Sequence, residues 1–385
     1  MKKISIVGAG SAGSMAAVYF GTHPDFEVDW YFDEQNPPVS VGEASQLNLP
    51  ILLELIGFNY SHIADIEGTL KTGIQKFNWG GTDFHHTFKN PNVAMHFNAQ
   101  ALQSWVKSKM SPVINIYNEK VDVENLDSDY TINCSGTPTN ITDDEFNLNY
   151  SIPVSSTYVI KIPWSMPELT HSLHIARPYG WVFGVPTKNY LSLGYQFNSN
   201  INSLEDIKKD FEEVLNFVGY ETDVNSGKTF SYKNYSRKNN FTEKMSYSGN
   251  ASYFLEPLEA TSLFHAERVI QLTHDVLDKN FNTSYAQKIY DEDFKRSQIM
   301  IMLHYLSGSV WDTEFWKFAQ SNAENVMIDA FKTDALWHDV VNQNLDVTEH
   351  YGGGWVQQSF NIHFNKLNVF SKLKNLQKKV LEREI

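Results

Sequence analysis

The chain has 385 residues, of which 42% are apolar and 14% are aromatic, enough for one large core or two lobes. Its net charge of −14 argues against a nucleic-acid partner. Cys134 is the single cysteine, so an internal disulfide is excluded and a reducing, cytoplasmic location is expected. We expect no membrane span and no signal peptide, because the apolar runs are short and the first residues lead directly into a strand.

The first residues predict a dinucleotide-binding turn. A short apolar strand over 4–7 runs into Gly8-Ala9-Gly10-Ser11-Ala12-Gly13, and a helical pattern follows. The first glycine permits a tight turn, the second lets a pyrophosphate approach the backbone, and the third allows close packing of helix on strand. A second strand, 28–32, ends at Asp33, where a ribose-binding carboxylate belongs. A solvated acidic turn is the alternative for Asp33.

A second loop of small residues is Gly42-Glu43-Ala44-Ser45, which predicts a tight approach to the cofactor. Glu43 could instead cap a helix predicted over 47–56. Alternation predicts a strand over 74–79, and Lys71 precedes it among apolar and small residues. Such a lysine is either an ordinary surface residue or a desolvated ammonium used as a donor or nucleophile.

The middle of the chain indicates strands rather than a metal site. Residues 80–110 are rich in histidine and aromatic residues, but their spacing matches no metal site, so none is predicted. Cys134 follows a predicted strand and is expected to be a buried small residue rather than a redox thiol. Four further strand patterns predict an antiparallel meander, and a helix is predicted after them: strands 158–162, 172–176, 180–186 and 191–197, and helix 203–218.

The stretch 254–263 carries two glutamates, Glu256 and Glu259, and leads through a small Ala-Thr-Ser run into a helical pattern. One interpretation is a strand, a turn and a helix that is capped by Thr261 or Ser262. The other is that Glu259 points into a cavity at a helix N-terminus, where the backbone N–H groups of Thr261 and Ser262 hold a small anion.

Together these stretches resemble the flavin-dependent halogenases, the group that includes the tryptophan halogenases. The resemblance covers residues 1–320 and is carried by the glycine turn at 8–13, the segments 41–45 and 70–79, Cys134-Ser135-Gly136, and the segments 180–186, 254–261, 304–305 and 311–316. The family's W-x-W-x-I-P signature appears here as Trp181-Val182-Phe183-Gly184-Val185-Pro186. Asn250 stands where flavoproteins of this class usually carry aspartate.

The resemblance implies an α/β fold: a Rossmann-like FAD-binding domain of the flavin monooxygenase type, an antiparallel substrate layer and a mostly helical C-terminal part. Residues 1–60, 111–145 and 240–285 would form a discontinuous FAD-binding domain. Residues 61–110, 146–239 and 286–385 would form the substrate-binding sheet and helical region. The residues implied to contact FAD are Gly8, Gly10, Ser11, Ala12, Gly13, Asp33, Gly42, Glu43, Ala44, Ser45, Asn250 and Leu258.

The resemblance also implies the chemistry. FADH2, O2 and chloride, bromide or iodide would give hypohalous acid, with the halide held at the N–H groups of Thr261 and Ser262. Lys71 would hold the hypohalous acid, by a hydrogen bond or as a haloamine, and Glu259 would polarise it or take the ring proton.

The same resemblance implies two partners. A separate flavin reductase would supply FADH2, and the substrate would be an electron-rich aromatic of the indole or phenol type. Free tryptophan is not expected, because the chain is shorter than the tryptophan halogenases. A homo-oligomer is compatible with the sequence.

Two other functions fit these residues. The first is a flavin-dependent monooxygenase or reductase of the same fold with no halide step, which a halide-dependent product would distinguish. The second is a flavin-free scaffold that binds a protein partner. Retention of the three glycines, of Lys71 and of Glu259 argues against the second.

Overall fold

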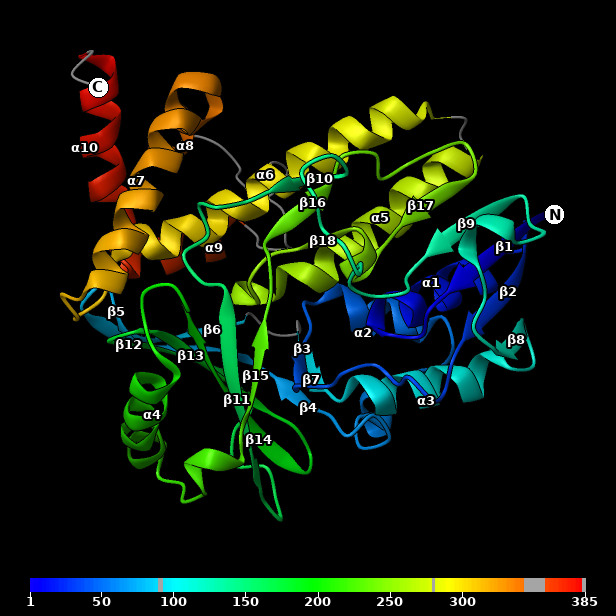
Figure 1. Cartoon of the computed structure of the whole chain (residues 1–385), viewed down its shortest axis with the longest axis horizontal. Helices are drawn as coiled ribbons and strands as arrows, with labels where there is room; N and C mark the ends of the chain where they lie inside the picture. The colour runs from blue at the N-terminus through cyan, green and yellow to red at the C-terminus, as the bar shows by residue number, and fades with distance from the viewer. Residues whose placement is uncertain (89–92, 279–280, 343–356, 383–385) are drawn as a thin grey trace.

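The structure is a computed structural model that describes residues 1–88, 93–278, 281–342 and 357–382. Figure 1 shows a parallel sheet near the N-terminus, a larger sheet on the other side of the molecule, and long helices that extend from one to the other. The two termini lie at opposite ends of the longest dimension. The α/β fold predicted from the sequence is confirmed.

The first sheet is parallel throughout and has the strand order β17-β9-β1-β2-β8. Its strands are β1 (Lys2–Val7), β2 (Phe26–Phe32), β8 (Asn115–Asn118), β9 (Tyr130–Asn133) and β17 (Met245–Tyr247). Helices α1 (Ser11–Gly21), α3 (Ala99–Met110) and α5 (Thr261–Asp278) share one apolar core with this sheet. Because parallel strands end at one edge, the loops after β1, β9 and β17 lie side by side there.

The second sheet has seven strands in the order β15-β11-β14-β13-β12-β5-β6. They are β5 (Gly73–Trp79), β6 (Thr82–Thr87), β11 (Ser156–Pro163), β12 (Ser172–Arg177), β13 (Gly180–Pro186), β14 (Tyr190–Phe197) and β15 (Lys228–Ser231). Of the predicted antiparallel meander, β12, β13 and β14 pair in sequence order, whereas β11 lies antiparallel beside β14 instead of β12, and β12 also pairs in parallel with β5.

Both faces of the inner strands β12, β13 and β14 are buried, whereas the edge strands β6 and β15 are largely exposed. On β13, Val182 packs with α4 (Leu204–Val218), whereas Trp181 and Phe183 pack toward α5 and the helices after it. Helix α4 begins at a capping box between Ser203 and Asp206, which satisfies two backbone N–H groups. Burial on both faces explains why β13 has apolar residues and glycine along its whole length.

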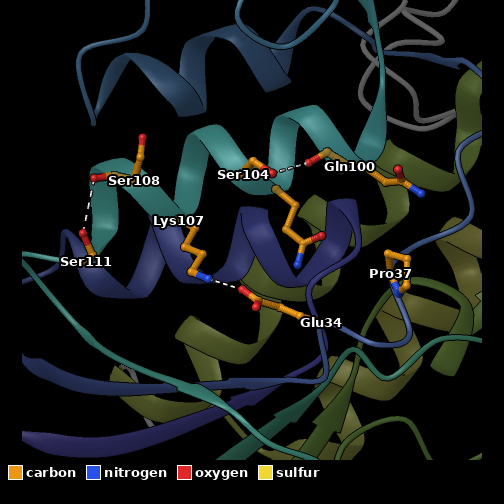
Figure 2. A pocket seen from close by; sticks show the side chains of 8 residues that line it. Glu34, Pro37, Gln100, Ser104, Lys107, Ser108 and Ser111 are labelled. Atoms are coloured by element: carbon orange, nitrogen blue, oxygen red, sulfur yellow. Dashed lines mark hydrogen bonds and ion pairs between the residues drawn. The ribbon is translucent and has the colours of Figure 1, made fainter.

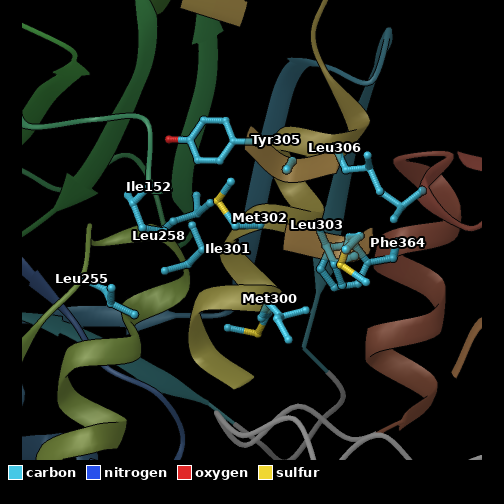
Figure 3. Close-up of a cluster of buried hydrophobic side chains, with 14 of the residues drawn as sticks. Ile152, Leu255, Leu258, Met300, Ile301, Met302, Leu303, Tyr305, Leu306 and Phe364 are labelled. Carbon is cyan, nitrogen blue, oxygen red and sulfur yellow. The ribbon is translucent and has the colours of Figure 1, made fainter. Parts of the chain in front are cut away.

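The C-terminal part is helical over the residues described, as predicted. Its helices are α6 (Thr283–Ser307), α7 (Glu314–Thr333), α8 (Leu336–Val341), α9 (Gln357–Lys366) and α10 (Val369–Leu381). The last turns of α6 are buried on every side. Figure 3 shows Met300 to Leu303, Tyr305 and Leu306 of this helix among other apolar side chains such as Leu258 and Phe364. None of the described helices is both long and apolar enough to cross a membrane.

Two small sheets and helix α2 (Asn48–Glu54) complete the described fold. One sheet consists of β10 (Phe146–Leu148), β16 (Tyr235–Arg237) and β18 (Tyr253–Phe254). In the other, β7 (Ala94–Phe97) pairs with both β3 (Glu43–Ala44) and β4 (Thr69–Lys71). Strand β7 therefore holds Lys71 beside the loop of small residues at 42–45.

Candidate active site

The glycine turn has the geometry of a nucleotide cradle. Gly8 has φ +107°, and a β-carbon on Gly13 would lie 2.0 Å from the carbonyl oxygen of Gly8, so both positions require glycine. A β-carbon on Gly10 would meet nothing closer than Pro38, at 4.0 Å. Open space thus lies at the first turn of α1, where the N–H groups of Ser11 and Ala12 have no partner within the helix. The geometry of this turn fits the pyrophosphate of a dinucleotide.

The segment after β2 holds the predicted ribose acid. The carboxylate of Asp33 accepts hydrogen bonds from Gln35 N at 2.9 Å and Asn36 Nδ2 at 2.6 Å, so it is engaged in its own turn. The next residue, Glu34, pairs with Lys107.

A polar pocket of about 550 Å³ lies beside this segment, on α3 (Figure 2). It is lined by Glu34, Pro37, Gln100, Gln103, Ser104, Lys107, Ser108 and Ser111. Lys71 and Glu259 do not line it. The reactive residues predicted from the sequence are therefore found elsewhere, in the interior.

The loop 42–45 connects the nucleotide region to Lys71. Gly42 has φ +90° and lies against Ser192. Glu43 accepts hydrogen bonds from Ser40 Oγ at 3.0 Å and from Ala99 N at 3.1 Å, so it binds the first N–H group of α3, whose N-cap is Asn98, and not the helix predicted after Glu43. Burial raises the pKa of Glu43 to about 7. Ala44 pairs with His96 on β7, and the carbonyl oxygen of the next residue, Ser45, accepts a hydrogen bond from Lys71.

Lys71 is buried rather than a surface lysine. Its Nζ donates to the carbonyl oxygen of Ser45 at 3.1 Å and lies 5.6 Å from the ring centre of Phe88. Burial lowers the pKa of Lys71 to about 8, although the charge of Glu259 acts in the opposite direction. An amine with this pKa is partly neutral near pH 8 and can donate or act as a nucleophile.

Glu259 sits on a strained turn just before α5. It has φ +63° and the following Ala260 has φ +56°, both in the left-handed region. Its carboxylate is fully buried and pairs with Lys76, whose Nζ lies 2.8 Å from Oε1. Burial acts to raise the pKa of Glu259, but the charge of Lys76 holds it well below its usual value. Glu259 is therefore ionised in the interior.

Three histidines surround this ion pair. His174 Nδ1 lies 3.4 Å from Glu259 Oε1, and His304 Nε2 lies 3.3 Å from the same oxygen. His363 Nε2 lies 3.1 Å from His304 Nε2. Ligand atoms of Glu259, His304 and His363 fall within 4.8 Å of one another, a spacing that could hold a metal ion. Lys76 already places a positive charge against Glu259, which disfavours a divalent cation there.

The predicted anion site lies at the start of α5. Thr261 has helical dihedral angles (φ −60°, ψ −30°), and Ser262 follows inside the helix. A cap requires an extended residue before the helix, so the prediction that either of them caps α5 is wrong. The hydroxyl group of Thr261 is buried and has no hydrogen-bond partner among the residues described.

The remaining predicted residues lie near the glycine turn or next to Glu259. Asn250, just after β17, donates to Thr137 Oγ1 at 3.4 Å, and Gly249 beside it contacts Ala12. Leu258 is fully buried next to Glu259. Cys134 is buried, as expected, and burial raises the pKa of its thiol to about 12.

The chain is similar to known proteins in sequence and in fold. The profile described as "Tryptophan halogenase" matches residues 3–113 and 115–361. The chain belongs to the tryptophan halogenase family. It is 24% identical over 188 residues to the tryptophan 6-halogenase SttH of Streptomyces toxytricini; the match covers 45% of this chain and 34% of that protein, about a third of its length.

Solved structures of similar fold also carry this family's name. A tryptophan halogenase from Shewanella frigidimarina superposes with a TM-score of 0.77 at 15% identity, over 100% of this chain and 94% of that one. Tar14, a tryptophan C-6 flavin-dependent halogenase (chlorinase) from taromycin biosynthesis, gives 0.76 at 18% identity, over 99% and 97%. Identities this low show a shared fold.

Sequence reasoning missed the partners of Glu259. Lys76, His174 and His363 were given no role, and His304 was noted only as part of the family resemblance. One signal was present: Lys76 alternates with Ile74 on the buried face of β5, where a lysine needs a partner.

Proposed function

We propose that this protein is a flavin-dependent halogenase that uses FADH2, O2 and a halide to modify an electron-rich aromatic substrate of the indole or phenol type. The observation that carries the proposal is that one loop contacts both predicted reactive residues. Ser45 accepts a hydrogen bond from Lys71, and Gln46 Nε2 donates to the carbonyl oxygen of Glu259 at 3.2 Å. Family membership and the activity of the relative from Streptomyces toxytricini support the same reaction.

FAD would be held by the predicted set at 8–13, Asp33, the loop 42–45, Asn250 and Leu258. Bound FADH2 supplies, with O2, the oxidation of the halide: FADH2 + O2 + X⁻ + H⁺ gives FAD, HOX and H2O. The halide would bind at the N–H groups of Thr261 and Ser262, where the N-terminal end of α5 favours an anion. A separate flavin reductase would supply FADH2, since the sequence has a single dinucleotide turn, and a reducing cytoplasm fits the lone thiol.

Lys71 would hold HOX and present the halogen in one orientation, either through a hydrogen bond or as a haloamine. The aromatic ring then attacks the halogen, a carbon–halogen bond forms, and the ring proton passes to Glu259. The balance is ArH + HOX giving ArX + H2O. Burial of both residues keeps water away from the reactive halogen.

The test is a turnover assay with FAD, a flavin reductase and NADH, using indole, phenol and tryptophan with each halide in turn and reading products by mass. We expect halogenated product that falls about 100-fold or more in Lys71→Met. Lys188→Met is the matched control, because Lys188 is exposed. Hydroxylated product, or no product while FAD still binds, would contradict the proposal and favour the monooxygenase or reductase.

A further inference from the structure

Two glutamates three residues apart lie in the same interior with opposite ionisation. Glu256 accepts hydrogen bonds from Tyr305 OH at 2.7 Å and Trp181 Nε1 at 3.2 Å, both neutral donors. Burial raises the pKa of Glu256 to about 8. Glu259 is just as buried, yet it has Lys76 against it and remains ionised. A cation beside only one of the two carboxyl groups therefore gives them different pKa values. Such a difference between neighbouring carboxyl groups commonly marks an acid and a base.

Among the described residues, three nitrogens lie within 3.4 Å of Glu259 Oε1, and Lys76 Nζ is the one with a proton to donate. His304 Nδ1 lies 2.9 Å from the carbonyl oxygen of Met300, which can only accept, so the neutral ring presents a lone pair at Nε2. The ammonium group of Lys76 can only donate, so His174 Nδ1, 2.8 Å from Lys76 Nζ, is the acceptor of that hydrogen bond.

Burial and the charge of Lys76 keep both of these histidines neutral, since they lower the pKa of His174 to about 3 and lower the pKa of His304. His363 beyond them is likewise held well below its usual pKa by burial and by Lys76. Lys71 is the other lysine whose charge is coupled to Glu259. The charge that directly contacts the carboxylate thus comes from β5.

The two oxygens of Glu259 have different surroundings. Oε1 is occupied by Lys76, whereas Oε2 is buried and has no hydrogen-bond partner among the residues described. A buried carboxylate oxygen without a partner is costly, and in an active site it is the atom available for a proton.

We infer that Lys76 is the positioning residue for the base: it holds Oε1 of Glu259, keeps the carboxylate ionised without water, and leaves Oε2 to take the ring proton. This inference rests on the proposed function, because it assumes that Glu259 is the base. Without Lys76, the effect of burial would no longer be offset by a cation in contact with the carboxylate, and the pKa of Glu259 would rise.

The first experiment measures kcat for halogenation against pH for the wild type, Lys76→Met and the control Lys188→Met. In Lys76→Met we expect the acid limb of the profile to move up by at least one pH unit, with activity partly recovered at high pH and FAD affinity unchanged. The control should keep the wild-type limb. A uniform loss at every pH, or an unmoved limb, would overturn the inference in favour of a merely structural lysine.

A second readout does not depend on turnover. Infrared difference spectra at pH 7 should show one protonated buried carboxyl in Lys76→Met beyond that of Glu256, and this additional signal should be absent from the wild type and from Lys76→Met/Glu259→Gln. Its absence would overturn the inference even in an active enzyme. If the wild type makes no halogenated product, the proposed function is rejected. The infrared spectra would still report whether Lys76 keeps Glu259 ionised. Should Lys76→Met not fold, Lys76→Arg keeps the charge, and a displaced acid limb there would count against the inference.

Discussion

The hydroxyl group of Tyr305 donates to Oε2 of Glu256 across 2.7 Å, and both side chains are fully buried. Trp181 donates to the same oxygen, so one carboxyl oxygen joins β13 to α6. The donors are neutral, and burial raises the pKa of Glu256 to about 8, which makes the protonated acid the form present at neutral pH.

This arrangement predicts a pH-dependent gain in stability from Glu256→Gln. Between pH 4.5 and 8 folded Glu256 keeps a proton that the unfolded chain loses, so its contribution to stability falls as pH rises. Glutamine has the shape of the protonated acid and does not titrate. We expect equal stability at pH 5 and a gain on the order of 3 kcal/mol at pH 8.5. Urea unfolding at both values checks this; an equal difference at both would mean that Glu256 is ionised in the folded protein.

Lys76 and Glu259 should be strongly coupled in stability. Lys76→Met or Glu259→Gln alone leaves one partner of a buried pair uncompensated, and each should cost about 3–5 kcal/mol. The double variant removes both and should lose much less than the sum. Urea unfolding of the four proteins gives the coupling energy. Additive losses would show that the pair does not interact as its 2.8 Å separation implies.

Gly10→Ala and Gly13→Ala should separate cofactor binding from folding. Gly10 has φ −63° and open space at its β-position, so alanine there should change stability by less than about 1 kcal/mol but weaken FAD binding about tenfold or more. Gly13→Ala would clash with Gly8 and should lower the melting temperature. Fluorescence titration measures the FAD affinity of each variant, and thermal melting measures its stability. Unchanged FAD affinity in Gly10→Ala would place the pyrophosphate elsewhere.

Asp210 should matter for stability and not for chemistry. It accepts two hydrogen bonds from Arg177, at 2.5 and 2.9 Å, and one from Tyr195 at 2.8 Å, and so fastens α4 to the second sheet. Helix α4 covers the face of the second sheet that is opposite to the face near Glu259. We expect Asp210→Asn to cost about 2–3 kcal/mol and to leave kcat unchanged at low temperature. Glu212→Gln, on the exposed side of α4, is the control; a fall in kcat with intact folding would contradict this division.

Local patterns predicted most of the fold. The glycine turn and the strand patterns at 158–197 depend on neighbours in the sequence, and they appear where expected. The cap expected from Thr261 or Ser262 failed because Glu259 and Ala260 take left-handed dihedral angles that bring the chain directly into α5. No local rule predicts two such residues in succession.

The candidate site was less accessible to sequence reasoning. Periodicity places Lys76 on a buried face, but its partner Glu259 lies 183 residues further along. His363 reaches the cluster from α9, 59 residues after His304. Contacts of this kind depend on how β5, α5, α6 and α9 pack, and no spacing within one element reports that packing.

The same long separations determine when the site can form. Lys76 and Glu259 meet only after the second sheet and the N-terminal end of α5 have come together, and closing so long a stretch of chain is a late and slow step in folding. A partly folded chain keeps Lys76 and Glu259 apart and in water, where a free lysine and a free glutamate behave ordinarily. The buried Lys76–Glu259 ion pair thus exists only in the completed molecule, so any chemistry that depends on it is confined to chains that have finished folding.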